Sequence, residues 1–390
     1  MKNIMKMFVA LFVVGIILPS CDKKNNENSS LSPEHKKALE QVSQDRRAGM
    51  EFLIKYMPDR DREELSADYL LEHVNLAYEA RNAHDWAKNI PEEIFLNDVL
   101  PYASFNEKRE SWRRDFRDRF SKYVNNSQTL EEAVRAINEN AKEELEVIYS
   151  TERPKPDQAP QESMSCGLAS CTGLSVLLVD AFRSVGIPAR IAGTPNWTQK
   201  QGNHNWVEVW IDGVWYFTEY YFDDLDQAWF LNDAGQANPN DKKYWIYATS
   251  FKPTSDSVHF PLVWDLDIQY VNAENVTDRY ISIYKEKNEE EKAKLDGKAK
   301  VEIKMFKDNV CSQIGDNRVS EEVQVFDKDG NLQGEGVTSA PEEDMNKILT
   351  MYLAKNKIYN LRYKNSSGKL KVEELNISED KYNIVLFFNE

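Results

Sequence analysis

Two residues of this sequence have the side-chain types that thiol chemistry requires, and the first is Cys171. It stands directly before an apolar run, residues 174–185, whose large side chains share one helical face, and Gly186 and Pro188 then stop the helix. Cys171 is therefore expected at the N-terminus of a helix, where unpaired backbone N–H groups and the helix dipole stabilise an anion such as a thiolate. A nucleophile fits this position, and so does a buried structural thiol.

The second residue is His204, which could act as a base toward a thiol. It opens the stretch "HNWVEVWIDGVWYF", residues 204–217, in which alternating side chains and a central Asp-Gly pair predict a β-hairpin. A side chain at the mouth of the first strand can project toward the end of a neighbouring helix. The remaining histidines lie in polar helical or loop segments without such a setting: His35, His73, His84 and His259.

The order and spacing of these motifs resemble the core of the transglutaminase-like superfamily. The matching features are Cys171, the stretch "GIPAR" at residues 186–190, and His204 in its hairpin, and the resemblance covers about residues 158–230. It implies a papain-like, cysteine-proteinase-type core in which Cys171 is the nucleophile and His204 is the base. The third member of the family's arrangement, normally an aspartate, corresponds here to Glu219.

Glu219 departs from the family pattern by one methylene group. A glutamate can still accept the second ring N–H of an imidazole and stabilise the imidazolium, provided that the backbone compensates for the longer side chain. Asp223 and Asp224 follow closely and could take the role instead, and a solvated Glu219 on an acidic protein is a third interpretation. Glu219 is the first choice among the three carboxylates.

The chemistry that the resemblance and the residue types imply is acyl transfer. His204 would take the proton of Cys171, the thiolate would attack an amide carbonyl, and backbone N–H groups at the helix start would meet the oxyanion. Gln161 or Ser170 could add a donor, although cap and turn roles are commoner for such residues. We expect a peptide, protein or other amide-bearing substrate, and no cofactor or metal. Hydrolysis is favoured over transfer to an amine as the reaction. A catalytically inactive binding module with the same fold is the alternative.

These residues need a scaffold, and the flanking segments predict an α+β protein with a helical N-terminal region. Residues 32–150 carry helical periodicity, strongest in four stretches: residues 32–56, 66–81, 106–123 and 129–147. Three prolines between residues 151 and 164 exclude helix there and predict an extended approach to the catalytic core, placed at residues 151–260 with an antiparallel sheet. Five tryptophans crowd this core, and most are expected to pack: Trp197, Trp206, Trp210, Trp215 and Trp229.

Residues 261–390 predict a small β-sandwich that positions the core or binds a partner. Its expected strands are short alternating segments: residues 301–306, 323–326, 358–363, 370–372 and 384–388. Asp327, Asp329 and Asn331 resemble a calcium loop only faintly, because the closing glutamate is missing, and a hairpin turn is the better interpretation.

The N-terminus predicts export. Lys2 and Lys6 precede an apolar stretch, residues 8–18, that is too short to span a bilayer and suits a signal peptide. The Leu-Pro-Ser-Cys of residues 18–21 resembles a bacterial lipobox, which implies a signal peptide over residues 1–21 and lipidation of Cys21; an ordinary secretory signal is the alternative. Polar residues 22–31 then form a tether. The protein is expected at the bacterial cell envelope, held to the membrane by its lipid and facing the periplasm or the cell surface.

Composition narrows the remaining roles. The chain has 49 Lys and Arg residues against 65 Asp and Glu, a formal net charge of −16, which disfavours nucleic acid as a partner. Apart from Cys21 the cysteines are Cys166, Cys171 and Cys311, an odd number with no recognisable disulfide framework. At least one thiol is therefore expected to stay free.

Overall fold

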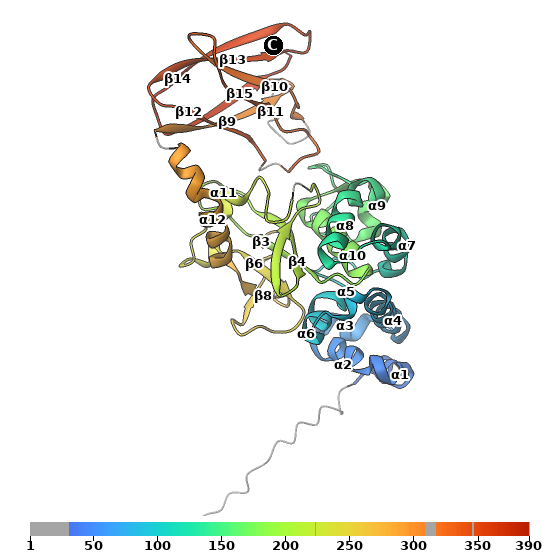
Figure 1. The fold of residues 1–390 in the computed structure, drawn as a ribbon. Helices are drawn as coiled ribbons and strands as arrows, with labels where there is room; N and C mark the ends of the chain where they lie inside the picture. The colour runs from blue at the N-terminus through green and yellow to red at the C-terminus, as the bar shows by residue number, and fades with distance from the viewer. Residues whose placement is uncertain (1–30, 223, 296, 309–316, 345–346, 390) are drawn as a thin grey trace, which may run out of the picture.

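The computed structural model of the chain describes residues 31–390, apart from residues 223, 296, 309–316, 345–346 and 390 (Figure 1). The predicted signal peptide with Cys21, and also Asp223 and Cys311, lie outside the described residues. Within the described part of the chain, no helix combines the length and the apolarity needed to cross a membrane.

The N-terminal region is helical, as predicted, and forms the blue and blue-green layers of Figure 1. Its elements are α1 (Pro33–Gln41), η1 (Gln44–Arg46), α2 (Arg47–Tyr56), α3 (Asp59–Glu64), α4 (Ala67–Ala83), α5 (Asp85–Lys88), α6 (Glu92–Ile94), η2 (Phe95–Val99), α7 (Trp112–Val124) and α8 (Leu130–Leu145). Ser66 and Thr129 start α4 and α8, because their side chains accept the N–H groups of Tyr69 (3.2 Å) and Glu132 (3.1 Å).

Two of the predicted helical stretches differ in the structure. Residues 32–56 do not form one helix, because Val42 and Ser43 adopt extended backbone angles between α1 and η1. The stretch predicted from residue 106 becomes helical only at Trp112. Before it, the Glu107 carboxylate accepts the N–H groups of Ser104 and Phe105, both at 2.7 Å, which stabilises a loop instead of a helical turn.

The proline-rich approach to the core is only partly extended. Residues 160–166 form a helix, α9 (Pro160–Cys166), where the sequence predicted no helix up to residue 164. Pro160 occupies the first helical position, where its missing N–H costs nothing. Strand β1 (Ile148–Tyr149) lies before the proline-rich stretch and pairs in parallel with β2 (Leu168–Ala169), which follows α9. Helix α10 (Cys171–Ser184) begins directly after β2.

The core contains a six-stranded antiparallel sheet with the strand order β5-β4-β3-β6-β8-β7. Its strands are β3 (Ala189–Thr194), β4 (His204–Ile211), β5 (Val214–Thr218), β6 (Tyr247–Ser250), β7 (Val258–His259) and β8 (Asn272–Asn275). The short elements α11 (Leu231–Ala234) and η3 (Lys242–Tyr244) lie between β5 and β6 in the chain. The α+β class predicted from the sequence is therefore confirmed.

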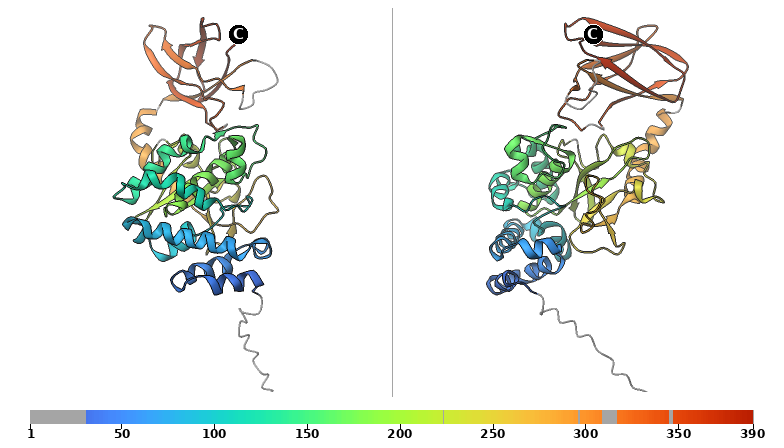
Figure 2. Two further views of the ribbon diagram at one scale, coloured as in Figure 1. Left: turned by 90° about the vertical axis from the view of Figure 1, so that its right-hand side faces the viewer. Right: turned by 180° about the vertical axis from the view of Figure 1, so that it is seen from behind.

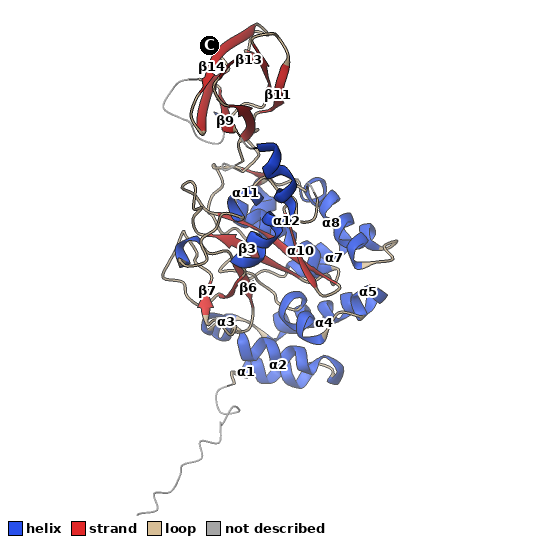
Figure 3. Ribbon diagram, turned by 60° about the vertical axis from the view of Figure 1, so that its left-hand side comes forward, coloured by secondary structure: helices blue, strands red, loops and turns tan. Residues whose placement is uncertain are grey.

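The two faces of this sheet are covered by different helices (Figure 3). Ile191, Val207 and Val209 pack against α10 and the helical region in one large apolar cluster. The opposite face packs under α12 (Thr277–Leu295), whose Tyr280 joins an aromatic cluster with Trp206. Alternate residues of β4 thus enter different clusters, as the period of two in its sequence requires.

The core extends beyond residue 260, where the sequence-based boundary was placed. β8 pairs with β6 and β7 inside the core sheet, and α12 covers that sheet before the chain leaves it. The "NAEN" of β8 has no alternating apolar face, so periodicity could not reveal it as a core strand. Both views in Figure 2 place the C-terminal unit at one end of the molecule, with the core between it and the first helices.

The C-terminal unit is a β-sandwich, as predicted. One sheet has the order β11-β10-β13-β14 and the other β12-β9-β15, with a separate apolar core between them. The strands are β9 (Lys298–Phe306), β10 (Glu322–Asp327), β11 (Leu332–Val337), β12 (Leu349–Ala354), β13 (Lys357–Lys364), β14 (Leu370–Ile377) and β15 (Lys381–Phe387).

The turn at residues 327–331 is a hairpin turn between β10 and β11, which confirms that interpretation. The Asp327 carboxylate accepts the N–H groups of Asp329 (3.0 Å) and Asn331 (2.8 Å), and Gly330 has a φ of +83°. Strand β11 was not predicted because Gly334 and Gly336 interrupt its pattern. A Cβ atom at Gly336 would lie 2.5 Å from Leu349 Cδ1, so this glycine leaves room for a side chain of the facing sheet.

Candidate active site

Cys171 is the first residue of α10, as the sequence predicted. Ser170 caps this helix: its Oγ accepts the N–H of Gly173 (3.1 Å) and donates to the carbonyl of Pro156 (2.5 Å). Ser170 is therefore a cap that ties the start of α10 to the preceding loop. The Cys171 side chain is partly exposed and its thiol is free, at a helix end where the backbone dipoles favour an anion.

The β4–β5 hairpin brings His204 and Glu219 together. His204 begins β4 and Glu219 directly follows β5, and these antiparallel strands place the start of one beside the end of the other. The turn has positive φ angles at Asp212 (48°) and Gly213 (101°), as a tight two-residue hairpin requires. His204 Nε2 lies 2.6 Å from Glu219 Oε1.

The backbone around Glu219 is held from the helical region. Asn138 on α8 donates from Nδ2 to the Glu219 carbonyl (2.9 Å), and its Oδ1 accepts the hydroxyl of Thr218 (3.0 Å). This fixed backbone position is what the longer glutamate side chain needs in order to reach the imidazole.

A third carboxylate reaches the same histidine from its other side. Asp344, in the connection between β11 and β12, has its Oδ2 3.3 Å from His204 Nδ1. The thiol of Cys171, a ring nitrogen of His204 and a carboxylate oxygen of Asp344 all lie within 4.8 Å of one another. His204 thus meets Glu219 at Nε2 and Asp344 at Nδ1, with the Cys171 thiol close by.

Aromatic rings hold the imidazole in this orientation. The ring centroid of His204 lies 4.9 Å from that of Trp229, 5.3 Å from Phe230 and 5.7 Å from Trp206. Trp206 in turn donates from Nε1 to the Tyr280 hydroxyl (2.6 Å), inside the cluster beneath α12. Trp197 and Trp206 are buried, in agreement with the expectation that the tryptophans of the core mostly pack.

Burial and charge act in opposite directions on the ionisable groups of the site. Burial alone would lower the pKa of His204, but the carboxylate of Asp344, together with Cys171 and Glu219, raises this pKa well above 6.5. Burial raises the pKa of Glu219 above its usual value, and the neighbouring His204 limits that rise. The imidazolium form of His204 is therefore favoured within this ring of acceptors.

Residues 118–220 match the family described as the transglutaminase-like superfamily. The matched segment contains Cys171, His204 and Glu219 and starts within α7, earlier than the resemblance seen in the sequence. This segment belongs to the transglutaminase-like superfamily. With its thiol, imidazole and carboxylate in contact range, the transglutaminase-like core has the residues of a cysteine-dependent enzyme.

The solved structures that match this chain are distant from it. One is described as a candidate cysteine protease from Cytophaga hutchinsonii, with 14% identity over 36% of this chain and 45% of that chain, and a TM-score of 0.28. Another is red sea bream transglutaminase, with 10% identity over 68% of this chain and 58% of that chain, and a TM-score of 0.26. This chain thus covers less than two thirds of either structure. A search of curated proteins gave no match.

The other candidates from the sequence lie away from the transglutaminase-like site. Asp224 forms an ion pair with Arg135 at 2.6 Å and does not contact His204, while Asp223 lies outside the described residues. Cys166 is exposed, and its thiol donates to backbone carbonyls of its own helix and of Leu168. Gln161 is bonded through its backbone: its N–H donates to the Glu110 carboxylate (2.8 Å) and its carbonyl accepts the Ser165 hydroxyl (2.5 Å).

Asp344 was missed by the sequence analysis. It lies in the stretch "APEEDMNK", one acidic residue among three, inside the unit predicted as a sandwich. No spacing rule relates it to His204, because only the packing of the C-terminal unit on the transglutaminase-like core brings the two together. The sequence therefore contains no signal that could have identified Asp344.

Cys171 lines both a small pocket and a wide groove. The pocket has a volume of about 20 Å³ and is lined by His204, Glu219 and Tyr220 among others. The groove has a volume of about 650 Å³ and runs past Arg153, Thr172 and Trp264. Both cavities are lined by Cys171 and Asp344, so the groove leads to the thiol beside this carboxylate.

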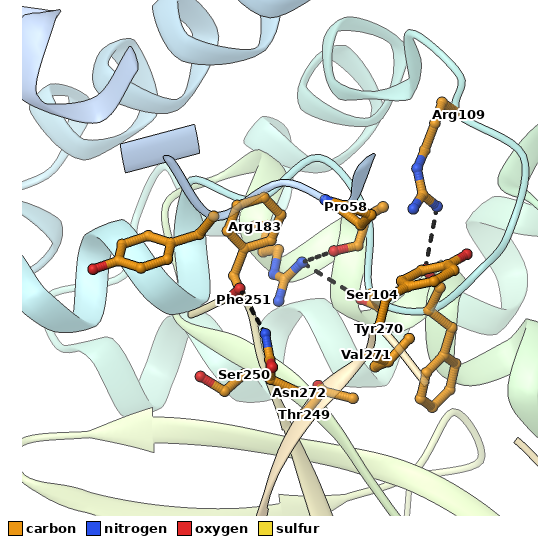
Figure 4. A pocket seen from close by; sticks show the side chains of 13 residues that line it. Pro58, Ser104, Arg109, Arg183, Thr249, Ser250, Phe251, Tyr270, Val271 and Asn272 are labelled. Atoms are coloured by element: carbon orange, nitrogen blue, oxygen red, sulfur yellow. Dashed lines mark hydrogen bonds between the residues drawn. The ribbon is translucent and has the colours of Figure 1, made fainter. Parts of the chain in front are cut away.

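A separate pocket, of about 40 Å³, lies between the helical region and strands β6 and β8 (Figure 4). In it, Arg183 donates from Nη1 to the carbonyl of Ala103 (3.2 Å) and to Ser104 Oγ (3.4 Å). Its lining shares no residue with the two cavities at Cys171. Because the Arg183 guanidinium in this pocket is already hydrogen-bonded to the neighbouring loop, we assign this pocket a structural role.

Proposed function

We propose that this protein is a cysteine-dependent acyl-transfer enzyme that hydrolyses amide bonds of peptides or other amide-bearing molecules through a Cys171 thioester. The observation that carries the proposal is the position of His204, with Glu219 on Nε2 and Cys171 near its other ring nitrogen. Cys171, His204 and Glu219 are given the roles of nucleophile, base and orienting carboxylate.

The first half-reaction forms the acyl-enzyme. His204 takes the proton from the Cys171 thiol, and the sulfur attacks the carbonyl carbon of the substrate to form an S–C bond. The carbonyl oxygen becomes an oxyanion at the first turn of α10, where helix N–H groups lack intrahelical partners. The C–N bond then breaks, and the leaving amine or ammonia takes the proton that His204 received.

The second half-reaction releases the acid. His204 removes a proton from water, and the hydroxide oxygen attacks the thioester carbon. The C–S bond breaks and the sulfur regains a proton from His204. Glu219 keeps the imidazole oriented and compensates its positive charge in both halves. An amine in place of water would give transfer, and water, the solvent that fills the groove beside Cys171, is the acceptor that we propose.

We further propose that the enzyme works at the bacterial cell envelope, where the lipid on Cys21 anchors it. This part rests on the sequence of residues 1–31 alone. The polar tether would let the catalytic core act on substrates a short distance from the membrane. The acidic surface, with a net charge of −16, is consistent with substrates that are not polyanions.

The test uses the chain without its signal peptide, a mixture of peptides from a casein digest, and a chelator in all samples. Release of ammonia and formation of new amino groups are measured, and hydroxylamine is used to intercept the thioester, which releases the acyl group as a hydroxamate and regenerates the thiol. We expect product and acyl hydroxamate with the wild type and neither with Cys171→Ala. Adding methylamine tests for transfer, which would appear as methylamide products.

Cys166→Ala is the matched control, because it removes an exposed thiol outside the site. Its turnover should equal that of the wild type. Equal turnover of Cys171→Ala and the wild type would refute the assigned nucleophile. A further outcome is that the chain binds peptides without turnover or thioester, and that Cys171 is alkylated no faster than a free thiol. That result would refute the enzyme and support the alternative, a catalytically inactive binding module.

A further inference from the structure

Cys171, His204 and Asp344 offer three different ligand atoms to one point. A thiol, an imidazole nitrogen and a carboxylate oxygen lie within 4.8 Å of one another. They come from the start of α10, the start of β4 and the β11–β12 connection. His204 is 2% exposed and Asp344 is 7% exposed, whereas Cys171 is partly exposed to the groove, so the point is open to water from that side alone.

One nitrogen in this cluster lacks the hydrogen bond that a buried polar atom normally has. His204 Nδ1 is buried and meets no acceptor at good hydrogen-bond geometry, and its 3.3 Å contact with Asp344 Oδ2 is an ion pair. Two ligand atoms at about 2.1 Å from a tetrahedral zinc ion are separated by about 3.4 Å. The spacing of these two atoms therefore suits a shared metal ion.

Glu219 completes the arrangement from outside. Its Oε1 lies 2.6 Å from His204 Nε2, so the Nε2–H donates to the carboxylate and Nδ1 is the nitrogen directed at Asp344. A histidine that binds a metal through one nitrogen commonly donates its other N–H to a carboxylate in this way. Loss of the Nδ1 proton from the imidazolium therefore leaves the tautomer that metal binding needs.

The segment that carries Asp344 is held firmly. Arg318 donates to the carbonyls of Asp344 (2.8 Å), Pro341 (3.4 Å) and Glu343, and the N–H of Lys347 donates to the Asp344 carbonyl (3.0 Å). Arg318 is itself buried. The carboxylate is therefore presented to the core by a fixed backbone, as a metal ligand requires.

We propose that Cys171, His204 and Asp344 form a site for a zinc-type divalent cation. The cation joins the C-terminal unit to the core and blocks the active site by binding the Cys171 sulfur. One thiolate, one imidazole and one carboxylate suit zinc, whereas calcium and magnesium prefer oxygen ligands alone. Binding releases the protons of the Cys171 thiol and of His204 Nδ1 and forms a metal–sulfur and a metal–nitrogen bond, so the bound sulfur can no longer attack a carbonyl. The fourth position faces the groove that Cys171 and Asp344 both line, where water can enter.

The proposal that bound metal inhibits the enzyme rests on the proposed function, but the proposal that the site binds metal does not. The first measurement is therefore a titration of the chelator-treated chain with Zn²⁺ by calorimetry, and with Co²⁺ by absorption, where cobalt–thiolate bonding gives a charge-transfer band. We expect one tight site in the wild type. Asp344→Asn should weaken it by about 10–100-fold, and Cys171→Ser should remove the charge-transfer band.

The second measurement is alkylation by iodoacetamide, resolved by peptide so that each cysteine is followed separately. Stoichiometric Zn²⁺ should slow alkylation of Cys171 but not of Cys166, and a chelator should restore the rate. Glu342→Gln is the matched control, because it removes a neighbouring carboxylate of the same segment that has no contact with His204. Its zinc affinity and protection should equal those of the wild type.

The outcomes separate the two proposals. Equal zinc affinity of Asp344→Asn and the wild type, with both folded by circular dichroism, would overturn the site, as would protection of Cys166 in place of Cys171. Tight zinc binding by a chain that never turns over substrate would support the site and refute the proposed function. Turnover that stoichiometric Zn²⁺ does not affect would refute the closure of the active site by metal.

Discussion

His204 Nδ1 lies 3.3 Å from Asp344 Oδ2, so the C-terminal unit places a carboxylate directly against the imidazole of the core. The opposite nitrogen of the same ring lies 2.6 Å from Glu219, which belongs to the core itself. One histidine therefore links the two units, and the C-terminal sandwich contributes a carboxylate to the candidate active site. The predictions below separate the contributions of these carboxylates, of the thiols and of the buried charges that support the sheet.

Glu219→Gln should keep the fold and lower turnover on the order of 10²-fold or more, because an amide cannot compensate the imidazolium charge. Alkylation of Cys171 should slow as well. Glu219→Asp should retain part of both rates. Asp224→Asn is the control, since Asp224 pairs with Arg135, and it should match the wild type. A loss caused by Asp223→Asn instead would move the orienting role to that residue.

Cys171 should react faster than Cys166 with iodoacetamide near neutral pH in the presence of a chelator. Exposure alone favours Cys166, which is the more accessible thiol, so faster labelling of Cys171 would report activation by the helix end and His204. Mass mapping of the labelled peptides after brief treatment gives the order. His204→Ala should abolish the preference, and earlier labelling of Cys166 in the wild type would speak against Cys171 as the reactive thiol.

Glu208→Ala should lower the free energy of unfolding by about 3–5 kcal/mol, because it leaves the buried Arg190 without its main counter-ion. Glu208 is fully buried and lies 2.8 Å from Arg190 and 2.7 Å from Arg279. Glu274→Ala removes a second carboxylate 3.1 Å from the same Arg190, but its side chain is 46% exposed. That control should cost about 0–1 kcal/mol. Urea unfolding measures both, and equal costs would contradict the assigned importance of burial.

Asp98 should contribute to the free energy of unfolding of the wild type, and this contribution should decrease as pH rises from about 4 to 6. Burial raises the pKa of Asp98 from 3.8 to about 6, with Arg190 and Arg183 acting against the rise. Within this interval the folded chain holds a proton that the unfolded chain has lost, which corresponds to about 3 kcal/mol in total.

Asp98→Asn lacks this proton, so the free energy of unfolding of the wild type relative to this variant should fall across that interval and stay constant above it. Urea unfolding of both proteins at several pH values gives the difference. A difference that is independent of pH between 4 and 7 would show that Asp98 ionises normally in the folded chain.

Cys21→Ser should release the protein from membranes and leave the catalytic core folded, if the lipobox resemblance is correct. Fractionation of cells that produce each form, with immunodetection of the chain, measures the distribution. Lys23→Ser, in the adjoining tether, is the control and should stay with the membrane fraction. Recovery of the wild type in the soluble exported fraction, with an unmodified Cys21 by mass spectrometry, would contradict the anchor.

The sequence alone determined the features that depend on local pattern. Cys171 at a helix start, the hairpin with His204 at its mouth, and the helical and β-rich regions all follow from capping residues, apolar periodicity and turn residues within a few positions of one another. The same local rules failed where a contact from another segment decided the outcome. The glycine-containing β11, the polar β8 and the helix at Pro160 are formed or permitted by neighbours that the pattern does not contain.

Tertiary structure alone decided which carboxylates meet His204. Glu219 and Asp224 are close in the sequence and similar in chemistry, but the register of β4 and β5 and the hydrogen bonds of Asn138 direct Glu219 to the imidazole, whereas Arg135 holds Asp224. Asp344 reaches the same ring only because the sandwich packs on the core and Arg318 fixes its loop. Contacts between segments far apart in the chain depend on how whole elements pack, and hydrophobic periodicity carries no information about that packing.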